Sequence, residues 1–295
     1  MTILQKHTGL KDSVPWWAKV GVKLVLSKMP VGYTTLRSIS LTRHGRMDRP
    51  AWAYETFRRH FDAADFPSKG GGFVLLEIGP GDSLFTGVLA RAFGASASRL
   101  VDIGPFARLD VSLYRELIGF LEAEGHPLPG LEGLPTTDAI LEACGAEYET
   151  GGLASLRALP SGSVDLAFSN AVLQLVRRAE LPETLAELRR VLRPGGVCSH
   201  SVGLWDQMSF ALNHLRFPER VWETDWVFNS GFYSNRFRFS EWLGLFRAAG
   251  FRPEFPEVNR WDSLPTPRSA LDPTFGKFDD EDLKVYSFNV VLHAD

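Results

Sequence analysis

The residues best suited to chemistry lie in one stretch, residues 73–83, which reads FVLLEIGPGDS. An apolar run typical of a strand leads to Glu77, then to a turn that contains Gly79 and Gly81, and then to a helix-like segment. Glycine adopts positive φ easily and lets a ligand approach the main chain, while the start of the next helix offers unpaired N–H groups. The pattern therefore predicts a strand–turn–helix unit that binds a ligand through its backbone.

A second acidic residue stands at the distance expected for a ribose ligand. Residues 98–103, SRLVDI, read as a short strand that ends near Asp102. An acid about 20 residues beyond a glycine-rich turn commonly accepts hydrogen bonds from ribose hydroxyls. The alternative is a strand-end acid that caps the next turn, and the glycine turn upstream favours ribose.

The third glycine of a dinucleotide-binding turn is missing. That turn has the pattern Gly-x-Gly-x-x-Gly, and Leu84 occupies the last glycine position. Because that glycine allows the helix to pack closely on the strand, Leu84 argues against a nicotinamide cofactor. An NAD(P)-dependent oxidoreductase stays as an alternative.

Two later segments extend the same layout. Residues 163–175, SVDLAFSNAVLQL, predict a buried strand whose carboxyl end carries Asn170. Open α/β sheets bind ligands at the carboxyl ends of their strands. Residues 181–191 predict a helix that stops at LRPGG, and residues 197–202 predict the next strand.

Together these landmarks, EIGPG, Asp102, VDLAFSN and LRPGG, resemble the motifs of the class I S-adenosylmethionine-dependent methyltransferases of small-molecule type over residues 73–202. The resemblance implies an α/β fold with a seven-stranded Rossmann-like methyltransferase sheet, mostly parallel with a C-terminal antiparallel strand. It also implies S-adenosylmethionine as the methyl donor. The residues that it places against the donor are Glu77, Gly79, Pro80, Gly81, Ser83, Asp102, Ile103, Ser155, Leu156, Asn170, Ala171 and Val172.

Three positions depart from the residues common in that family. Ser83 stands where a third glycine is frequent, and Gln174 stands where histidine is frequent. Ser155 stands where an Asp before a Leu-Pro pair commonly holds the adenine amino group. These departures leave open a donor-binding scaffold without catalytic activity.

Four segments are expected along the chain. They are an N-terminal helical cap (1–69), a donor-binding core (70–202), a substrate-covering insertion between strands 5 and 6 (203–239), and a C-terminal helix with a strand pair that completes the core (240–295). The clearest helix of the cap runs over 50–64, where Pro50 suits the first turn and Asp48 suits the N-cap.

Methyl transfer from a sulfonium requires an acceptor held in line with the methyl group, and proton removal when the acceptor is OH or NH. His200 is the first candidate base and Asp206 the second, while a buried structural histidine is the alternative for His200. The aromatic and polar residues of the insertion either line an acceptor pocket or stabilise the insertion itself. The residues expected to bind the acceptor are Tyr54, Gln207, Asn213, His214 and Arg216.

Composition limits the partners. The 295 residues carry a net charge of -3, with Lys and Arg scattered, which argues against a nucleic-acid substrate. Cys144 and Cys198 form no paired framework, which suits a reducing cytoplasm. The pattern of His, Cys and carboxylates predicts no metal site. The expected acceptor is the O or N of a small polar metabolite or a saccharide, and the sequence indicates no oligomeric state.

The sequence shows no signal peptide and no transmembrane segment. The apolar tract over residues 16–30 is interrupted by Lys19 and Lys23. We expect this tract to be a helix that packs on the core, and peripheral membrane contact is the alternative.

Overall fold

The computed structural model describes residues 15, 16, 18, 21, 46–207 and 209–294. Seven strands form one sheet in the order β3-β2-β1-β4-β5-β7-β6. Strands β1 to β5 are parallel, and β7 is antiparallel to both of its neighbours, β5 and β6. The strands are β1 (Val74–Ile78), β2 (Ala97–Val101), β3 (Ala146–Glu149), β4 (Val164–Asn170), β5 (Leu192–Gly203), β6 (Arg252–Arg260) and β7 (Val285–His293). This order confirms the predicted fold class.

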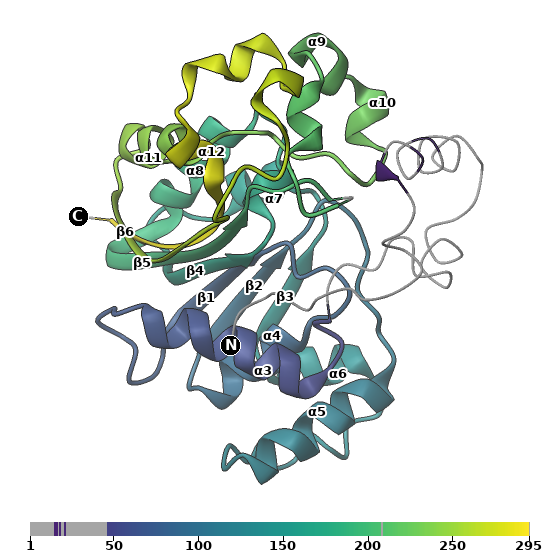
Figure 1. The fold of residues 1–295 in the computed structure, drawn as a ribbon. Coiled ribbons are helices and arrows are strands. Elements are labelled where there is room, and N and C mark those ends of the chain that lie inside the picture. The colour runs from purple at the N-terminus through teal and green to yellow at the C-terminus, as the bar shows by residue number, and fades with distance from the viewer. Residues whose placement is uncertain (1–14, 17, 19–20, 22–45, 208, 295) are drawn as a thin grey trace.

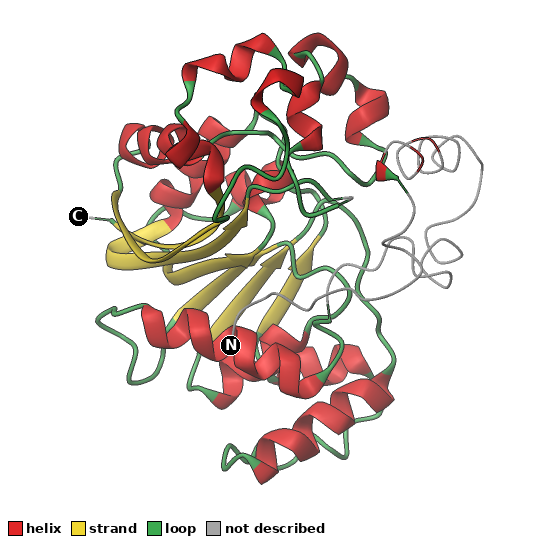
Figure 2. Ribbon diagram, in the orientation of Figure 1, coloured by secondary structure: helices red, strands yellow, loops and turns green. Residues whose placement is uncertain are grey.

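Helices cover both faces of the sheet (Figures 1 and 2). One face, called here the α3 face, carries α3 (Pro50–Ala63), α4 (Phe85–Ala92), α5 (Val111–Ala123) and α6 (Thr137–Ala143). The other face, called the α8 face, carries α7 (Leu153–Ala158), α8 (Leu181–Val191) and α11 (Phe239–Ala248). The remaining elements are α9 (Glu219–Trp222), α10 (Asp225–Phe228), α12 (Asp280–Lys284) and the 3-10 turns Leu173–Leu175, Asn213–Arg216, Arg268–Ala270 and Pro273–Lys277.

Each face has its own apolar core because side chains alternate along a strand. Leu166 and Phe168 of β4 lie in the core of the α3 face. Ala167 and, on β5, Cys198 lie in the core of the α8 face. This alternation fixes which face each polar side chain near the strand ends occupies.

Two local expectations are corrected. Asp48 does not cap α3, because the N-cap is Arg49 without a side-chain bond and the Asp48 carboxylate pairs with Arg108 at 3.3 Å. The LRPGG segment does not precede β5 but lies inside it. Gly195 adopts a φ of 76° there, and the pairing with β4 shifts between Val164 and Leu166.

The segment between β5 and α11 forms a small unit of its own, with α9 and α10 side by side at one end of the molecule (Figure 1). Trp222, Phe232 and Tyr233 are buried against one another in a separate apolar cluster. The insertion is therefore built around its own core.

Most of the N-terminal tract over 16–30, together with its membrane alternative, lies outside the described residues. Its described Trp16 packs edge-on against Phe217 of the insertion, with ring centroids 6.2 Å apart. None of the helices within the described ranges is long and apolar enough to cross a membrane.

Candidate active site

The turn after β1 needs glycine at its first position. Gly79 has a φ of 72°, and a Cβ atom there would lie 2.6 Å from Cγ2 of Val172. The turn after β1 and the turn after β4 are therefore in direct contact. Gly81 also has a positive φ, 67°, so both predicted glycines use conformations that other residues rarely adopt.

Asp102 joins the ends of β1 and β2. Its carboxylate accepts hydrogen bonds from the backbone N–H of Gly81 (2.9 Å) and of Ile103 (2.7 Å). The Ile103 side chain beside it is 72% exposed, which leaves an apolar surface next to an oriented acid.

Glu77 is a buried carboxyl group at the end of β1. It is 2% exposed, and its Oε2 atom has no hydrogen-bond partner among the described residues. Burial raises the pKa of Glu77 to about 8, the Thr86 hydroxyl counteracts part of the rise, and the Asp102 charge adds to it. A buried acceptor without a partner, beside the glycine turn, suits a cationic ligand group.

A cavity of about 550 Å³ opens at the carboxyl ends of β2 and β3. Its walls include Ile103, the loop over residues 150–154, and Phe228 with Asn229 of the insertion. The backbone N–H of Gly152 donates to the carbonyl of Asp102 at 2.8 Å, which fixes this loop beside the acid. The sequence interpretation missed residues 150–154, although the glycine pair Gly151 and Gly152, shortly after β3, was a usable signal.

Ser155 and Leu156 lie just beyond that wall. The Ser155 hydroxyl accepts a hydrogen bond from the Gly151 N–H at 3.1 Å, and the Leu156 N–H donates to the Gly152 carbonyl within the first turn of α7. The structure therefore ties both residues to their own loop, and the loop before them borders the cavity.

The end of β4 carries a strained residue. Ala171 has a φ of 59°, unusual for a residue with a Cβ atom, and such strain is common at functional sites. Its N–H donates to the Ser201 carbonyl at 2.9 Å. The neighbouring Asn170 has a buried Oδ1 atom without a partner in the described part of the chain, as has Oε1 of Gln174.

Pro80 and Ser83 are both buried within the turn region. The Ser83 hydroxyl donates to the carbonyl of Met47, so it ties the turn to the segment that precedes α3. Ser83 thus fixes the glycine turn to the segment that precedes α3.

The structure does not support His200 or Asp206 as the base. His200 is 0% exposed, its Nδ1 lies 2.8 Å from the Ser169 hydroxyl, and it points into the α8 face. Burial lowers the pKa of His200 to about 3. Asp206 is 1% exposed and accepts bonds from Ser209 and from both nitrogens of Asn213, so it orders the insertion.

The residues expected to bind the acceptor do not converge. Tyr54 lies in the core of the α3 face, with its hydroxyl 3.3 Å from Nε2 of His126. Asn213 receives a bond from Arg216 Nε at 2.8 Å and donates to Asp206, so these residues hold one loop together. His214 is buried beside Trp222, and burial lowers its pKa to about 3. Gln207 is exposed.

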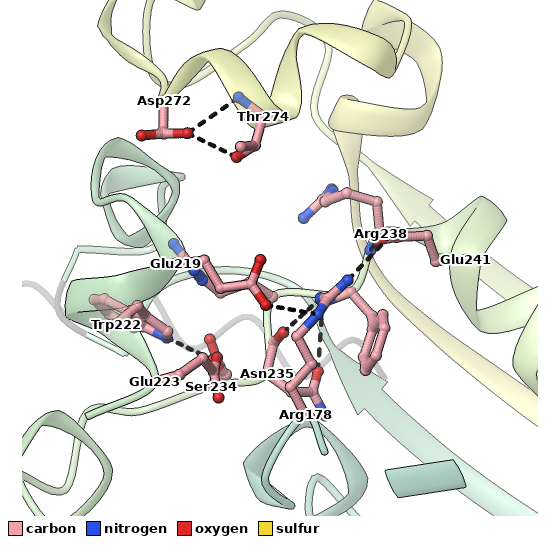
Figure 3. Close-up of polar contacts among 12 residues, drawn as sticks. Arg178, Glu219, Trp222, Glu223, Ser234, Asn235, Arg238, Glu241, Asp272 and Thr274 are labelled. Atoms are coloured by element: carbon pink, nitrogen blue, oxygen red, sulfur yellow. Dashed lines mark hydrogen bonds and ion pairs between the residues drawn. The ribbon is translucent and has the colours of Figure 1, made fainter. Parts of the chain in front are cut away.

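Arg178 anchors the insertion to the core (Figure 3). Its guanidinium pairs with Glu219 of α9 and Glu241 of α11, donates to the Asn235 carbonyl, and stacks on the Phe237 ring with Cζ 3.8 Å from the centroid. The insertion wall of the cavity is therefore tied to the sheet.

The residues at this edge fit S-adenosylmethionine. The Glu77 carboxyl suits the cationic part of the donor, Asp102 suits the ribose hydroxyls, and the exposed Ile103 suits the flat base. When bound, S-adenosylmethionine supplies a methyl group activated by the sulfonium charge.

Comparison with known proteins agrees with this geometry. Residues 76–199 match the profile of a family described as "Methyltransferase domain". No curated protein matches the sequence.

Several solved structures resemble the chain. One is a putative methyltransferase in complex with the Trm112 methyltransferase activator of Haloferax volcanii, at 17% identity and a TM-score of 0.46, covering 88% of this chain and 95% of that one. Another is an S-adenosylmethionine-dependent methyltransferase from Mesorhizobium loti, at 19% identity and a TM-score of 0.42, covering 76% and 92%. A third is an arsenic(III) methyltransferase from Chlamydomonas reinhardtii, at 16% identity and a TM-score of 0.45, covering 80% and 72%. At these levels the likenesses do not bear on the acceptor.

The sheet has seven strands and is mostly parallel with an antiparallel C-terminal strand, β7, as the resemblance predicted. The family profile covers the chain from the middle of β1 to the middle of β5, which includes the glycine turn and Asp102. Residues 76–199, which include the glycine turn and Asp102, are therefore similar to the methyltransferase domain family.

Proposed function

We propose that this methyltransferase acts on an oxygen or nitrogen atom of a small polar metabolite or a saccharide, with its donor held by Glu77, Gly81 and Asp102. The observation that carries the donor assignment is the Asp102 carboxylate, which accepts the N–H of Gly81 and so joins two strand ends at the edge beside the cavity. Two backbone donors orient that carboxylate before a ligand arrives.

The residues at the site act chiefly by positioning. The new bond forms from an acceptor lone pair to the methyl carbon, the electrons of the methyl–sulfur bond stay on sulfur, and an OH or NH acceptor passes its proton to water. Holding the reacting atoms in line supplies a large part of such an acceleration. Asn170, Ala171 and Val172 border the glycine turn and are the residues we place beside the reacting methyl group.

Isothermal titration calorimetry with S-adenosylmethionine tests the donor site. Asp102→Ala is expected to weaken binding by about tenfold to a hundredfold, because it removes charge-assisted hydrogen bonds worth about 1.5–3 kcal/mol each. Glu147→Ala is the matched control: its carboxylate is 62% exposed and pairs with Arg99 on the surface. An unchanged affinity in Asp102→Ala, or tighter binding of NADH than of S-adenosylmethionine, would overturn the assignment.

A second measurement separates an enzyme from an idle donor-binding scaffold. The wild-type protein is incubated with S-adenosylmethionine and a small-molecule extract, and S-adenosylhomocysteine is quantified. Catalysis predicts accumulation that depends on the extract and is lost in Asp102→Ala at low donor concentration. Donor binding without any product would establish the scaffold instead.

A further inference from the structure

A row of polar side chains crosses the α3 face at the end of β4. The register pairs Asn170 with Ser201, Ser201 with Asn289, and Asn289 with Glu257, across β4, β5, β7 and β6. The Ser201 hydroxyl donates to Oδ1 of Asn289 at 2.6 Å, and Nδ2 of Asn289 donates to Glu257 at 2.5 Å. The row begins at Asn170, whose side chain lies beside His60 of α3.

The row one step earlier on the same face is partly apolar. There β4 places Phe168 and β7 places Val291 in the apolar core, while Ser199 of β5, between them, lies 2.9 Å from Nδ1 of His60 on α3. Polar side chains become more frequent where the strands reach the edge at which β1, β2 and β4 end.

A second row lies beyond the first and carries an aromatic ring. Gly203 pairs with Ser287, and Ser287 pairs with Asn259, whose Nδ2 atom donates to the Ser287 hydroxyl at 3.2 Å. A Cβ atom on Gly203 would lie 2.9 Å from the Trp205 ring. The indole therefore rests directly on the glycine backbone, on the same face as both rows.

Trp205 belongs to a cluster of aromatic rings. Its ring centroid lies 5.5 Å from that of Phe210, and Phe210 lies 5.4 Å from Trp261 and 5.1 Å from Tyr286. Trp205 and Trp261 are partly exposed, and Phe210 is 36% exposed. The cluster stands beside the polar rows and gives them an apolar border.

We propose that these two rows and the Trp205 ring form the acceptor subsite, and that the acceptor is polyhydroxylated, of the sugar class. Hydroxyl, amide and carboxylate side chains on neighbouring strands offer hydrogen-bond donors and acceptors to several hydroxyl groups of one ligand. An aromatic ring beside them packs against the C–H face of a sugar. The assignment rests on the proposed methyl transfer. The row runs from Asn170, next to the donor turn, outward to Glu257 at the surface.

This subsite replaces the expected one in the insertion. Asp206 and Asn213, the polar residues expected there, are 1% and 5% exposed and hold their own loop. The rows on β5, β7 and β6 instead present hydrogen-bonding side chains that are partly exposed at Asn259, Ser287 and Asn289. Among the described residues, these rows are therefore the better candidates to bind an acceptor.

The test uses an acceptor class rather than a known acceptor. The full chain is incubated with methyl-labelled S-adenosylmethionine and the small-molecule fraction of an extract from cells that make the protein. One half of the fraction is first treated with periodate, which cleaves vicinal diols, and is then quenched and desalted. We expect the label to enter the untreated fraction and incorporation to fall at least tenfold after periodate.

Variants then locate the subsite. Trp205→Ala and Asn289→Ala are each expected to lower incorporation by about tenfold or more, with donor affinity by calorimetry unchanged. Trp205→Phe keeps a ring over Gly203 and should restore most of the incorporation. Trp226→Ala, which removes a 43% exposed ring on α10, is the matched control and should leave incorporation at the wild-type level.

The outcomes separate the two proposals. Incorporation that survives periodate, or that is unchanged in both Trp205→Ala and Asn289→Ala, overturns this subsite and leaves the methyltransferase assignment standing. Absence of donor binding, or donor binding without incorporation into any fraction, overturns the proposed methyl transfer and this subsite with it.

Discussion

At Glu77, the requirement of the proposed donor site for a carboxyl group conflicts with the stability of the fold. The Glu77 carboxyl group is 2% exposed, and burial, its main perturbation, raises its pKa from 4.5 to about 8. A carboxyl group that the fold keeps neutral lowers the free energy of unfolding at any pH at which the same group is ionised in the unfolded chain. We propose that a ligand, rather than packing, accounts for the position of Glu77 beside the glycine turn.

The first prediction concerns the pH dependence of the free protein. Between pH 4.5 and about 8 the folded protein holds a Glu77 proton that the unfolded chain has lost, so the free energy of unfolding falls as the pH rises. The pKa rise corresponds to about 5 kcal/mol above pH 8. Glu77→Gln should therefore unfold at a higher temperature than the wild type at pH 8.5, and similarly at pH 5. Thermal unfolding without donor measures this, and equal differences at both pH values would contradict it.

The second prediction concerns the proton itself. A cationic donor beside Glu77 favours the charged carboxylate, so binding at pH 7 should release about one proton. Calorimetric titrations of S-adenosylmethionine in buffers of different ionisation enthalpy report the number released. Glu77→Gln should bind more weakly and release none, and a buffer-independent enthalpy in the wild type would refute the placement of the cationic group.

At this scale the sequence predicts some residues and not others. The position of Asp102 was predictable because the strand that follows the glycine turn ends there, and its binding to ribose stays a prediction. The role of His200 was not predictable, because the face that a strand residue occupies depends on pairing that one sequence does not show. The structure turns His200 toward Ser169 in the α8 face. Period two along 287–291 was the available signal for Ser287 and Asn289.

At the scale of elements, the contact between the turns after β1 and β4 is the feature with the clearest consequence. Gly79 combines a φ of 72° with a Cβ position 2.6 Å from Val172. Gly72, which leads into β1, has a similar φ of 75° with nothing within 4 Å of a Cβ. Comparing substitutions at Gly72 and Gly79 therefore distinguishes the cost of backbone strain from the cost of a steric clash.

The third prediction uses that pair. Gly72→Ala should lower the free energy of unfolding by about 1 kcal/mol, the usual cost of a left-handed backbone with a Cβ. Gly79→Ala carries the same strain and also pushes Val172 away, so it should cost at least about 1 kcal/mol more and weaken donor binding about tenfold. Urea unfolding and calorimetry measure both. Indistinguishable variants would mean that the two turns do not depend on each other.

The elements themselves were largely readable. The strand–turn–helix unit at β1, helix α8, strand β4 and the C-terminal strand pair appear where the hydrophobic period and the turn residues predict them. For the insertion, the sequence predicted only the residue range, because its Trp and Phe content fits the wall of a pocket and a separate apolar core equally well. The burial of Trp222 to 1% exposed shows that its main part is a core.

At the scale of the whole molecule, three buried histidines make the free energy of unfolding depend on pH in the acidic range. His60 is buried against Ser199 with its Nδ1 2.9 Å from the hydroxyl, and burial holds its pKa well below 6.5. Burial lowers the pKa values of His200 and His214 to about 3. All three must stay neutral in the fold.

The fourth prediction follows from these groups. Below pH 6.5 these histidines bind protons in the unfolded chain but stay neutral in the folded protein. Their contribution to the free energy of unfolding is therefore complete above pH 6.5 and is lost as the pH falls toward 3. Each should contribute about 1.4 kcal/mol per pH unit to that loss. His200→Gln should reduce the slope of unfolding free energy between pH 6 and 5 by about that amount. Urea unfolding at both pH values tests it, and parallel slopes would contradict it.

Strand β7 is the latest described strand along the chain, yet it occupies an interior place in the sheet, between β5 and β6. During synthesis, one edge of β5 and both edges of β6 have no neighbour in the sheet until residues 285–293 have left the ribosome. Unpaired edges recruit strands from other chains. A message cut short within residues 261–284 would thus yield an aggregation-prone product rather than a weakened enzyme, and translation of residues 285–293 is itself a step in closing the sheet.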